Sequence, residues 1–215
     1  MHTVTASTTS GVWTSLTDNT SSWTKVNDSF GSNIIPKPDL ADWTNSLVTR
    51  TQSEIGRDGI HNQAWLLSES SGSTGLLYEI TSISLTGSIT YEYSMFIRKD
   101  SDVSREPFAY IKIASGSYAH SDKVLLNTSD GTYTETTTEG NGVVYVQDDE
   151  NWWKLAIQVT PDVTGTWSLF YQIAPAGGVS GALSNAATGS IIVDDVQLKA
   201  LPPSPTAWNR LGTGE

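Results

Sequence analysis

Apolar and polar residues alternate along several stretches of the chain, and this two-residue period is the strongest constraint on the fold. The pattern is clearest over residues 88–99, 151–160 and 165–174. Successive side chains of a strand point to opposite faces of a sheet, so each stretch predicts a half-buried antiparallel strand. Shorter apolar runs predict further strands at 65–68, 76–83, 108–114, 123–127, 143–147 and 191–198.

Segments rich in turn residues separate these runs, and no stretch shows a helical period. We expect turns at 70–75, 116–122, 129–142 and 175–189, where Gly, Ser, Asn, Asp and Pro gather. About nine strands at this spacing predict an all-β sandwich or a closed barrel.

Composition excludes several functional classes. The chain of 215 residues contains no cysteine, which excludes disulfides, thiol catalysis and cysteine-ligated metals. Twelve basic residues against 23 acidic ones give a net charge of −11, so nucleic acid is not an expected partner. We also expect no membrane insertion, because no apolar stretch is long enough to span a bilayer, and no secretory signal is visible at the start.

The two ends differ from the central part. Residues 1–32 are rich in Ser, Thr and Asn and include Trp13 and Trp23, which could dock on a partner if this segment is an extended arm. The alternative is that the arm adds a strand to the same sandwich. Residues 201–215 begin with a proline-rich stretch, which predicts an extended tail. The predicted domains are therefore an arm (1–32), a sandwich (33–200) and a tail (201–215).

Candidate catalytic groups are few. His2, His61 and His120 lack metal-ligand spacing, and no nucleophile or phosphate-loop motif occurs. The acidic runs 148–150 and 194–195 could hold a general acid and base, although a solvated acidic turn before the following strand is the favoured explanation of the first. We expect a protein that is not an enzyme and has no cofactor. Calcium bound by Asp39, Asp58 and Asp195 is the exception we keep open, since hard cations take oxygen ligands.

Aromatic residues on the outward strand faces are the more informative signal. Flat rings beside planar polar groups suit sugars, whose C–H faces stack on rings and whose hydroxyls need hydrogen-bond partners. Cover by the arm, a second subunit or another layer would explain the same rings. The predicted glycan-binding residues are Phe96, Tyr110, Trp152, Phe170, Glu92, Lys112 and Gln172.

Seven segments in order resemble a known family. They are 33–44 (NIIPKPDLADWT), 58–59 (DG) with 64–67 (AWLL), 77–80 (LYEI), 89–99 (ITYEYSMFIRK), 151–155 (NWWKL), 192–198 (IVDDVQL) and 205–208 (PTAW). Together they resemble the carbohydrate-binding-module-like jelly rolls of bacteriophage tail fibres and virion surface proteins. Calcium-binding relatives often carry an acid where this chain has Ala41, a departure that counts against their structural calcium.

The resemblance implies an all-β, two-sheet antiparallel jelly-roll sandwich with an N-terminal arm and without catalytic activity. It favours a virion surface protein, such as a capsid decoration protein, head fibre or tail receptor-binding subunit. Its expected partners are other virion proteins, a host surface glycan and further copies of itself, most simply as a trimer. One alternative is a carbohydrate-binding module of a secreted polysaccharide-degrading enzyme. A depolymerase or lyase on a jelly-roll scaffold is another.

Overall fold

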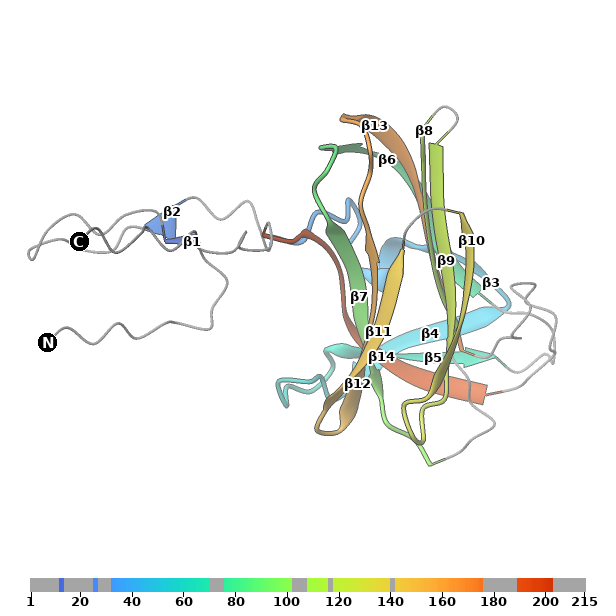
Figure 1. Cartoon of the computed structure of the whole chain (residues 1–215). Coiled ribbons are helices and arrows are strands. Elements are labelled where there is room, and N and C mark those ends of the chain that lie inside the picture. The colour runs from blue at the N-terminus through green and yellow to red at the C-terminus, as the bar shows by residue number, and fades with distance from the viewer. Residues whose placement is uncertain are drawn as a thin grey trace, which may run out of the picture.

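Two antiparallel sheets pack face to face as a jelly-roll β-sandwich (Figure 1). The structure is a computed structural model, and it describes residues 12–13, 25–26, 32–69, 76–101, 108–115, 118–139, 142–175 and 189–202. Each main sheet has six strands. Within the described ranges, no helix is long and apolar enough to cross a membrane.

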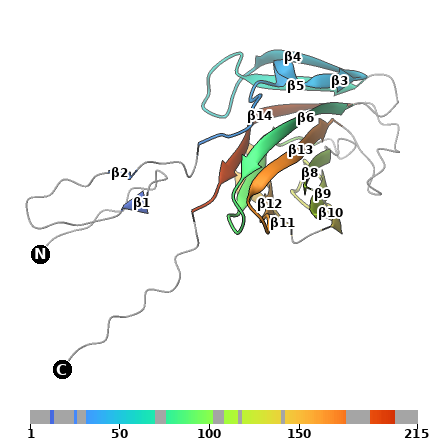
Figure 2. The same cartoon turned by 90° about the horizontal axis from the view of Figure 1, so that it is seen from above.

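The first sheet has the strand order β10-β9-β8-β13-β6-β3 and the second β11-β12-β7-β14-β5-β4. Figure 2 shows β6, β13, β8, β9 and β10 following one another along one side of the sandwich. The strands of the first sheet are β3 (Thr44–Ser46), β6 (Leu76–Leu85), β8 (Phe108–Ser115), β9 (Tyr118–Leu126), β10 (Tyr133–Glu139) and β13 (Gly165–Ala174). Those of the second are β4 (Val48–Glu54), β5 (Ala64–Glu69), β7 (Tyr91–Arg98), β11 (Val143–Asp149), β12 (Trp152–Val159) and β14 (Gly189–Ala200).

Smaller elements complete the described part. A 3-10 helix, η1 (Leu40–Asp42), follows Asp39, whose carboxylate accepts the Ala41 amide at 2.9 Å and so caps the helix. Strands β1 (Val12–Trp13) and β2 (Lys25–Val26) pair with each other in a separate two-stranded sheet. Apart from Ser32, the rest of the predicted arm, including Trp23, lies outside the described residues, as does the predicted tail beyond residue 202.

The core follows the alternation in the sequence. Tyr93 and Ile97 of β7 and Leu169 and Tyr171 of β13 are almost fully buried between the sheets. Tyr171 packs edge-on against Trp43, with ring centroids 4.6 Å apart, at the centre of this cluster. A buried side chain of this size contributes about 1.5–3 kcal/mol relative to an exposed one. The residues of opposite parity are thereby directed to the outer faces. In β7 most of these residues are buried as well, since Glu92, Ser94 and Phe96 are at most 8% exposed.

All nine predicted strands are confirmed, but two predicted turns are wrong. Part of segment 116–122 belongs to β9, and segment 129–142 contains β10. Strands β3 and β4 were not predicted either. Two of these missed elements are edge strands of polar residues, TNS in β3 and YTETTTE in β10, and neither has an apolar face that a two-residue period could reveal.

Candidate functional site

Three aromatic rings lie together on the outer face of the first sheet. Because Leu169, Tyr171 and Ile173 of β13 are buried in the core, Phe170 and Gln172 must point outward. The strand register then places Gln172 opposite both Tyr78 of β6 and Tyr110 of β8. We call Tyr78, Tyr110, Phe170 and Gln172 the aromatic platform.

Ring contacts hold the aromatic platform together. The Phe170 ring centroid lies 5.3 Å from that of Tyr110, in an edge-to-face arrangement. It lies 6.0 Å from the Tyr78 centroid, at an interplanar angle of 41°. All three rings are half-buried, whereas Gln172 is only 5% exposed between them. Such contacts favour the observed ring positions by about 0.5–1.5 kcal/mol per pair.

Apolar and cationic groups flank the aromatic platform. Ile80 and Lys112 lie on either side of Phe170 in the strand register, and Ile80 is 61% exposed. The ammonium group of Lys123 lies 5.4 Å from the Tyr110 ring centroid, within the range of a cation–π contact. The surface therefore combines exposed apolar area with hydrogen-bond donors.

The structure divides the predicted glycan-binding residues between opposite faces of the molecule. Tyr110, Phe170, Lys112 and Gln172 share the outer face of the first sheet. Phe96, Trp152 and Glu92 belong to the outer face of the second sheet. No single flat ligand surface can include both sets.

Phe96 and Trp152 point outward, as the alternation predicts, but they are buried, at 8% and 6% exposure. The guanidinium of Arg57 lies 4.0 Å above the Phe96 ring. Ion pairs with Asp149 and Asp195 hold Arg57 in this position. We therefore place neither ring in the candidate site.

Glu92 belongs to a polar cluster on the second sheet. Its carboxylate accepts hydrogen bonds from Lys154 Nζ at 2.7 Å, from Gln158 Nε2 at 3.0 Å and from the Tyr145 hydroxyl. Burial alone would raise the pKa of Glu92, but these hydrogen bonds outweigh burial and lower it. Burial would likewise lower the pKa of Lys154, which the bond to Glu92 instead raises. The acceptors of the carboxylate are thus used within the protein.

The three acids predicted to bind calcium come from separate segments and lie around two pockets. Asp39 and Asp195 line a pocket of about 320 Å³, and Asp58 and Asp195 line another of about 230 Å³. Backbone amides and Arg57 occupy their oxygens: Asp58 accepts the Ile60 amide at 3.0 Å, and Arg57 lies 3.6 Å from Asp195. Within the described ranges, no three acidic or histidine side chains are grouped so that they could hold a metal ion. Calcium binding stays a prediction.

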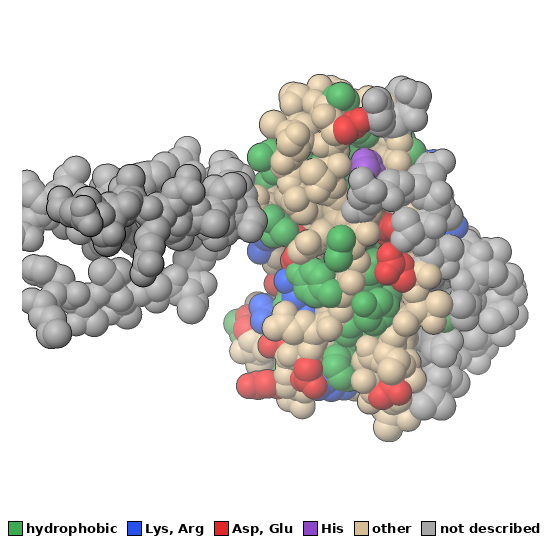
Figure 3. Space-filling view, in the orientation of Figure 1, with side chains coloured by type: hydrophobic (Ala, Val, Ile, Leu, Met, Phe, Trp, Pro, Cys, Tyr) green, Lys and Arg blue, Asp and Glu red, His purple; other side chains and the backbone are tan. Residues whose placement is uncertain are grey.

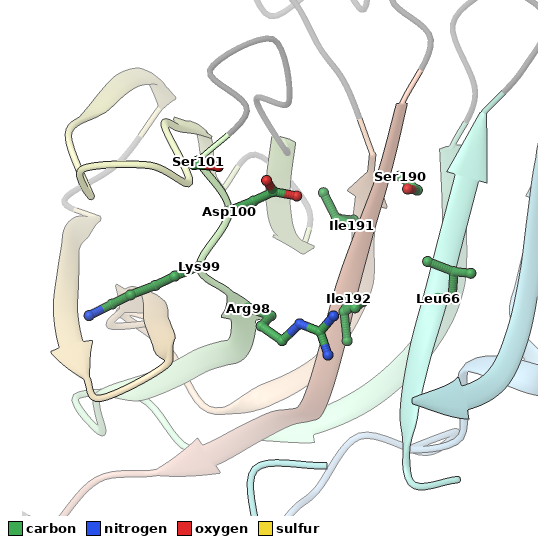
Figure 4. Close-up of a pocket in the computed structure, with 8 residues that line it drawn as sticks. All are labelled: Leu66, Arg98, Lys99, Asp100, Ser101, Ser190, Ile191 and Ile192. Atoms are coloured by element: carbon green, nitrogen blue, oxygen red, sulfur yellow. The ribbon is translucent and has the colours of Figure 1, made fainter. Parts of the chain in front are cut away.

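A further pocket, of about 300 Å³, opens where two strands of the second sheet separate (Figure 4). The register of β14 with β7 begins at Val193 and Ile97, so residues 189–192 of β14 have no β7 partner. Arg98 and Asp100 point into this gap from one side, and Ile192 lines the other. The lining of this pocket includes an arginine and two isoleucines but no aromatic ring, so the pocket is a weaker candidate for sugar stacking than the aromatic platform.

One member of the aromatic platform, Tyr78, was not predicted. Its signal lies in the odd positions of β6, where Leu77, Ile83 and Leu85 are apolar, so that Tyr78 must face outward. The buried Glu79 interrupts that pattern; its carboxylate is paired with Lys37 Nζ at 2.8 Å. Of the predicted partner-binding tryptophans, Trp13 is described only as part of the β1 backbone.

Charged and hydrophobic side chains are both visible on the face of the molecule drawn in Figure 3. On this face acidic side chains are spread out and hydrophobic side chains gather near the middle.

Among the candidate catalytic residues, His120 is buried, at 8% exposure, and His61 is exposed. The paired acids Asp194 and Asp195 are engaged, since Asp194 accepts the Arg57 amide at 2.7 Å and Asp195 pairs with the Arg57 guanidinium.

No protein-family model and no curated protein sequence matches the chain. Among solved structures, a family 61 carbohydrate-binding module in complex with β-1,4-galactotriose has a TM-score of 0.43 and 11% identity, covering 79% of this chain and 99% of that one. The CBM22-2 xylan-binding domain from Paenibacillus barcinonensis Xyn10C has a TM-score of 0.41 and 15% identity, covering 76% and 94%. A tailspike protein of an Acinetobacter baumannii bacteriophage, a capsular polysaccharide depolymerase, has a TM-score of 0.25 and 9% identity, covering 72% and 21%.

These likenesses concern the fold and transfer no site residue. They do not test the carbohydrate-binding role that the sequence resemblance implies. They give no support to a virion role, which stays a prediction, as do the trimer and the virion or secreted location.

Proposed function

We propose that the protein is a carbohydrate-binding module and that it binds a polysaccharide chain on the aromatic platform. The observation that carries the proposal is the grouping of three half-buried rings around Gln172 on one face of a sheet. This reading corresponds to the alternative of a module from a polysaccharide-degrading system, and it involves no catalysis.

The chemistry of the aromatic platform matches what a sugar requires. Pyranose rings present patches of C–H groups, which pack on aromatic faces and release water from both surfaces. Their hydroxyls need partners that donate and accept hydrogen bonds, and the hydroxyl of the half-buried Tyr78 can do both, whereas Gln172 is only 5% exposed. Because Gln172 is held between Tyr78 and Tyr110, little side-chain entropy remains to be lost when a ligand binds.

The sheet geometry suits an extended chain. Neighbouring strands lie about 4.8 Å apart, so a ligand crossing them passes from Tyr78 over Gln172 to Tyr110 within about 10 Å. That span is about the length of two linked pyranose units, for which the strands provide a flat base. Several weak ring contacts, summed over the span, would provide the affinity.

Affinity electrophoresis of the full chain through gels containing β-1,4-galactan, xylan, mannan or polygalacturonate tests the proposal. We expect retardation by at least one of these polysaccharides. Phe170→Ala should weaken that binding about tenfold, since the loss of one stacking ring is worth about 1–2 kcal/mol. Tyr133→Ala is the matched control, because Tyr133 is 42% exposed on edge strand β10 and lies outside the aromatic platform.

Circular dichroism should show that both variants keep the fold. Migration unaffected by any of the four polysaccharides would count against the proposal. So would a Phe170→Ala protein that binds as tightly as the parent.

A further inference from the structure

We infer that the aromatic platform selects acidic polysaccharides, namely chains that contain uronic acids, and that Lys112 is the residue that binds their carboxylates. The inference rests on the proposed function and names its substrate class. Four observations carry it: the charges on the face, the free ammonium of Lys112, its position beside Phe170 and the neutral amide of Gln172.

The outer face of the first sheet has an unusual charge balance for this protein. The whole chain has 23 acidic against 12 basic residues, so a surface sampled at random should carry mainly carboxylates. The side chains described on this face include Lys112 and Lys123 and no carboxylate. They are Thr44, Ser46, Leu76, Tyr78, Ile80, Ser82, Ser84, Tyr110, Lys112, Ala114, Ala119, Ser121, Lys123, Leu125, Thr134, Thr166, Ser168, Phe170, Gln172 and Ala174. The strand register also brings Glu139 to this face, opposite Ser121, but its side chain lies outside the described residues.

The ammonium of Lys112 has no ion pair or hydrogen bond among the described residues. Three other lysines are paired, whereas Lys199, like Lys112, has no ion pair or hydrogen bond among the described residues. Lys37, Lys99 and Lys154 each end on a carboxylate oxygen at 2.6–2.8 Å. Lys112 is only partly exposed, so its stem packs on the sheet while its charge is left for an external anion.

The position of Lys112 fits a carboxylated sugar. Lys112 lies directly opposite Phe170 in the strand register, about 5 Å away across the sheet. A pyranose stacked on Phe170 would project its C6 carboxylate beyond the edge of the ring by a similar distance. The flexible four-carbon stem and three donors of lysine can then meet the carboxylate in several orientations.

Gln172 also favours acidic sugars, because it is an uncharged residue that does not repel their carboxylates. Its amide carries no charge, whereas a glutamate at this buried position would repel a uronate. Ser121, on the far side of Lys112 in the register, is also uncharged. The described side chains around Phe170 therefore either attract an anion, as Lys112 does, or carry no charge, as is the case for Gln172 and Ser121.

The experiment compares each acidic polysaccharide with its own carboxyl-reduced form, so that only the charge changes. Polygalacturonate and hyaluronate, and their reduced derivatives, are titrated into the full chain by calorimetry at low and high salt. We expect the acidic forms to bind about fivefold more tightly at low salt, the magnitude of a partly exposed ion pair. This preference should shrink in 0.5 M NaCl, where the screening length is below about 5 Å.

Lys112→Gln should remove the preference for the acidic form, so that the ratio of the affinities for the acidic and reduced forms falls to about one. Lys112→Arg should keep the preference. Lys199→Gln is the matched control, because Lys199 lies opposite Glu92 on the other sheet. Thermal unfolding should show that all three variants fold like the parent.

Equal binding of the acidic and reduced forms would overturn the inference, as would an unchanged preference in Lys112→Gln. The proposed function would still stand after either of these results if the parent binds neutral chains and Phe170→Ala does not bind them. If neither acidic nor neutral chains bind to the parent, both the inference and the proposed function are wrong.

Discussion

Glu92 offers the most quantitative test of the structure. Replacing it by glutamine keeps its size but removes its charge and one of its two acceptor oxygens. The native carboxylate accepts from Lys154 at 2.7 Å, from Gln158 at 3.0 Å and from Tyr145. A hydrogen bond to a charged group is worth about 1.5–3 kcal/mol, and a donor left without an acceptor adds a desolvation cost.

Solvent reduces this loss. The Lys154 side chain is 23% exposed, so water can take over part of its hydrogen bonding once the carboxylate is gone. We therefore expect Glu92→Gln to lower the free energy of unfolding by about 2–3 kcal/mol at pH 7. For a chain of this size each kcal/mol corresponds to about 2–4 °C, so the melting temperature should fall by about 5–10 °C.

The pH dependence of unfolding is a second, independent test of the stabilisation by Glu92. Because the pKa of folded Glu92 is lowered from its ordinary value of 4.5, the stabilisation is complete above that value and is lost as pH falls through the folded pKa. The advantage of the parent protein over Glu92→Gln should therefore begin to shrink once the pH falls below about 4.5 and should be smaller at pH 3 than at pH 7.

Urea denaturation followed by tryptophan fluorescence at pH 7 and pH 3 measures both quantities. Asp148→Asn is the control. It removes a comparably short ion pair, in which the Asp148 carboxylate lies 2.6 Å from Lys99 Nζ, but the Asp148 side chain is 64% exposed. We expect a change within about 0.5 kcal/mol for this control. The reasoning is refuted if Glu92→Gln unfolds like Asp148→Asn, or if its deficit is the same at both pH values.

Other substitutions test the core and a turn. Tyr171→Phe should raise stability by about 1 kcal/mol, because its buried hydroxyl has no hydrogen-bond partner in the described structure. Tyr91→Phe should lower it by about 1 kcal/mol, because the Tyr91 hydroxyl accepts the Thr86 amide at 2.9 Å. Equal shifts in the two urea midpoints would contradict this contrast. Gly131→Ala should cost about 2–4 kcal/mol by the same assay, since φ is +77° and an added Cβ would lie 2.6 Å from the Trp153 ring. A midpoint close to that of the parent would show that the turn tolerates a side chain.

Much of the fold could be predicted because it is encoded locally. In β7 and β13, the two-residue period showed which residues enter the core and which face outward, and the structure agrees at Tyr93, Phe96, Tyr171 and Phe170. The period failed where a strand has no apolar face, as in β10, because an edge strand of threonine and glutamate buries too little to show a pattern.

The candidate site could be predicted only in part, because it depends on which strands become neighbours. Alternation shows that Phe96 and Phe170 both point outward but not that they belong to different sheets. It is also silent on Arg57, which covers Phe96 only because ion pairs with Asp149 and Asp195 hold it there.

The sequence by itself therefore determined an all-β architecture and, in the strands that have an apolar face, the inward or outward direction of the side chains, since both follow from backbone geometry within one strand. The tertiary structure alone decided that Tyr78, Tyr110 and Phe170 meet around Gln172, and that Phe96 and Trp152 are covered. Strand pairing joins residues far apart in the chain, and its register is set by the packing of the whole core rather than by any local pattern.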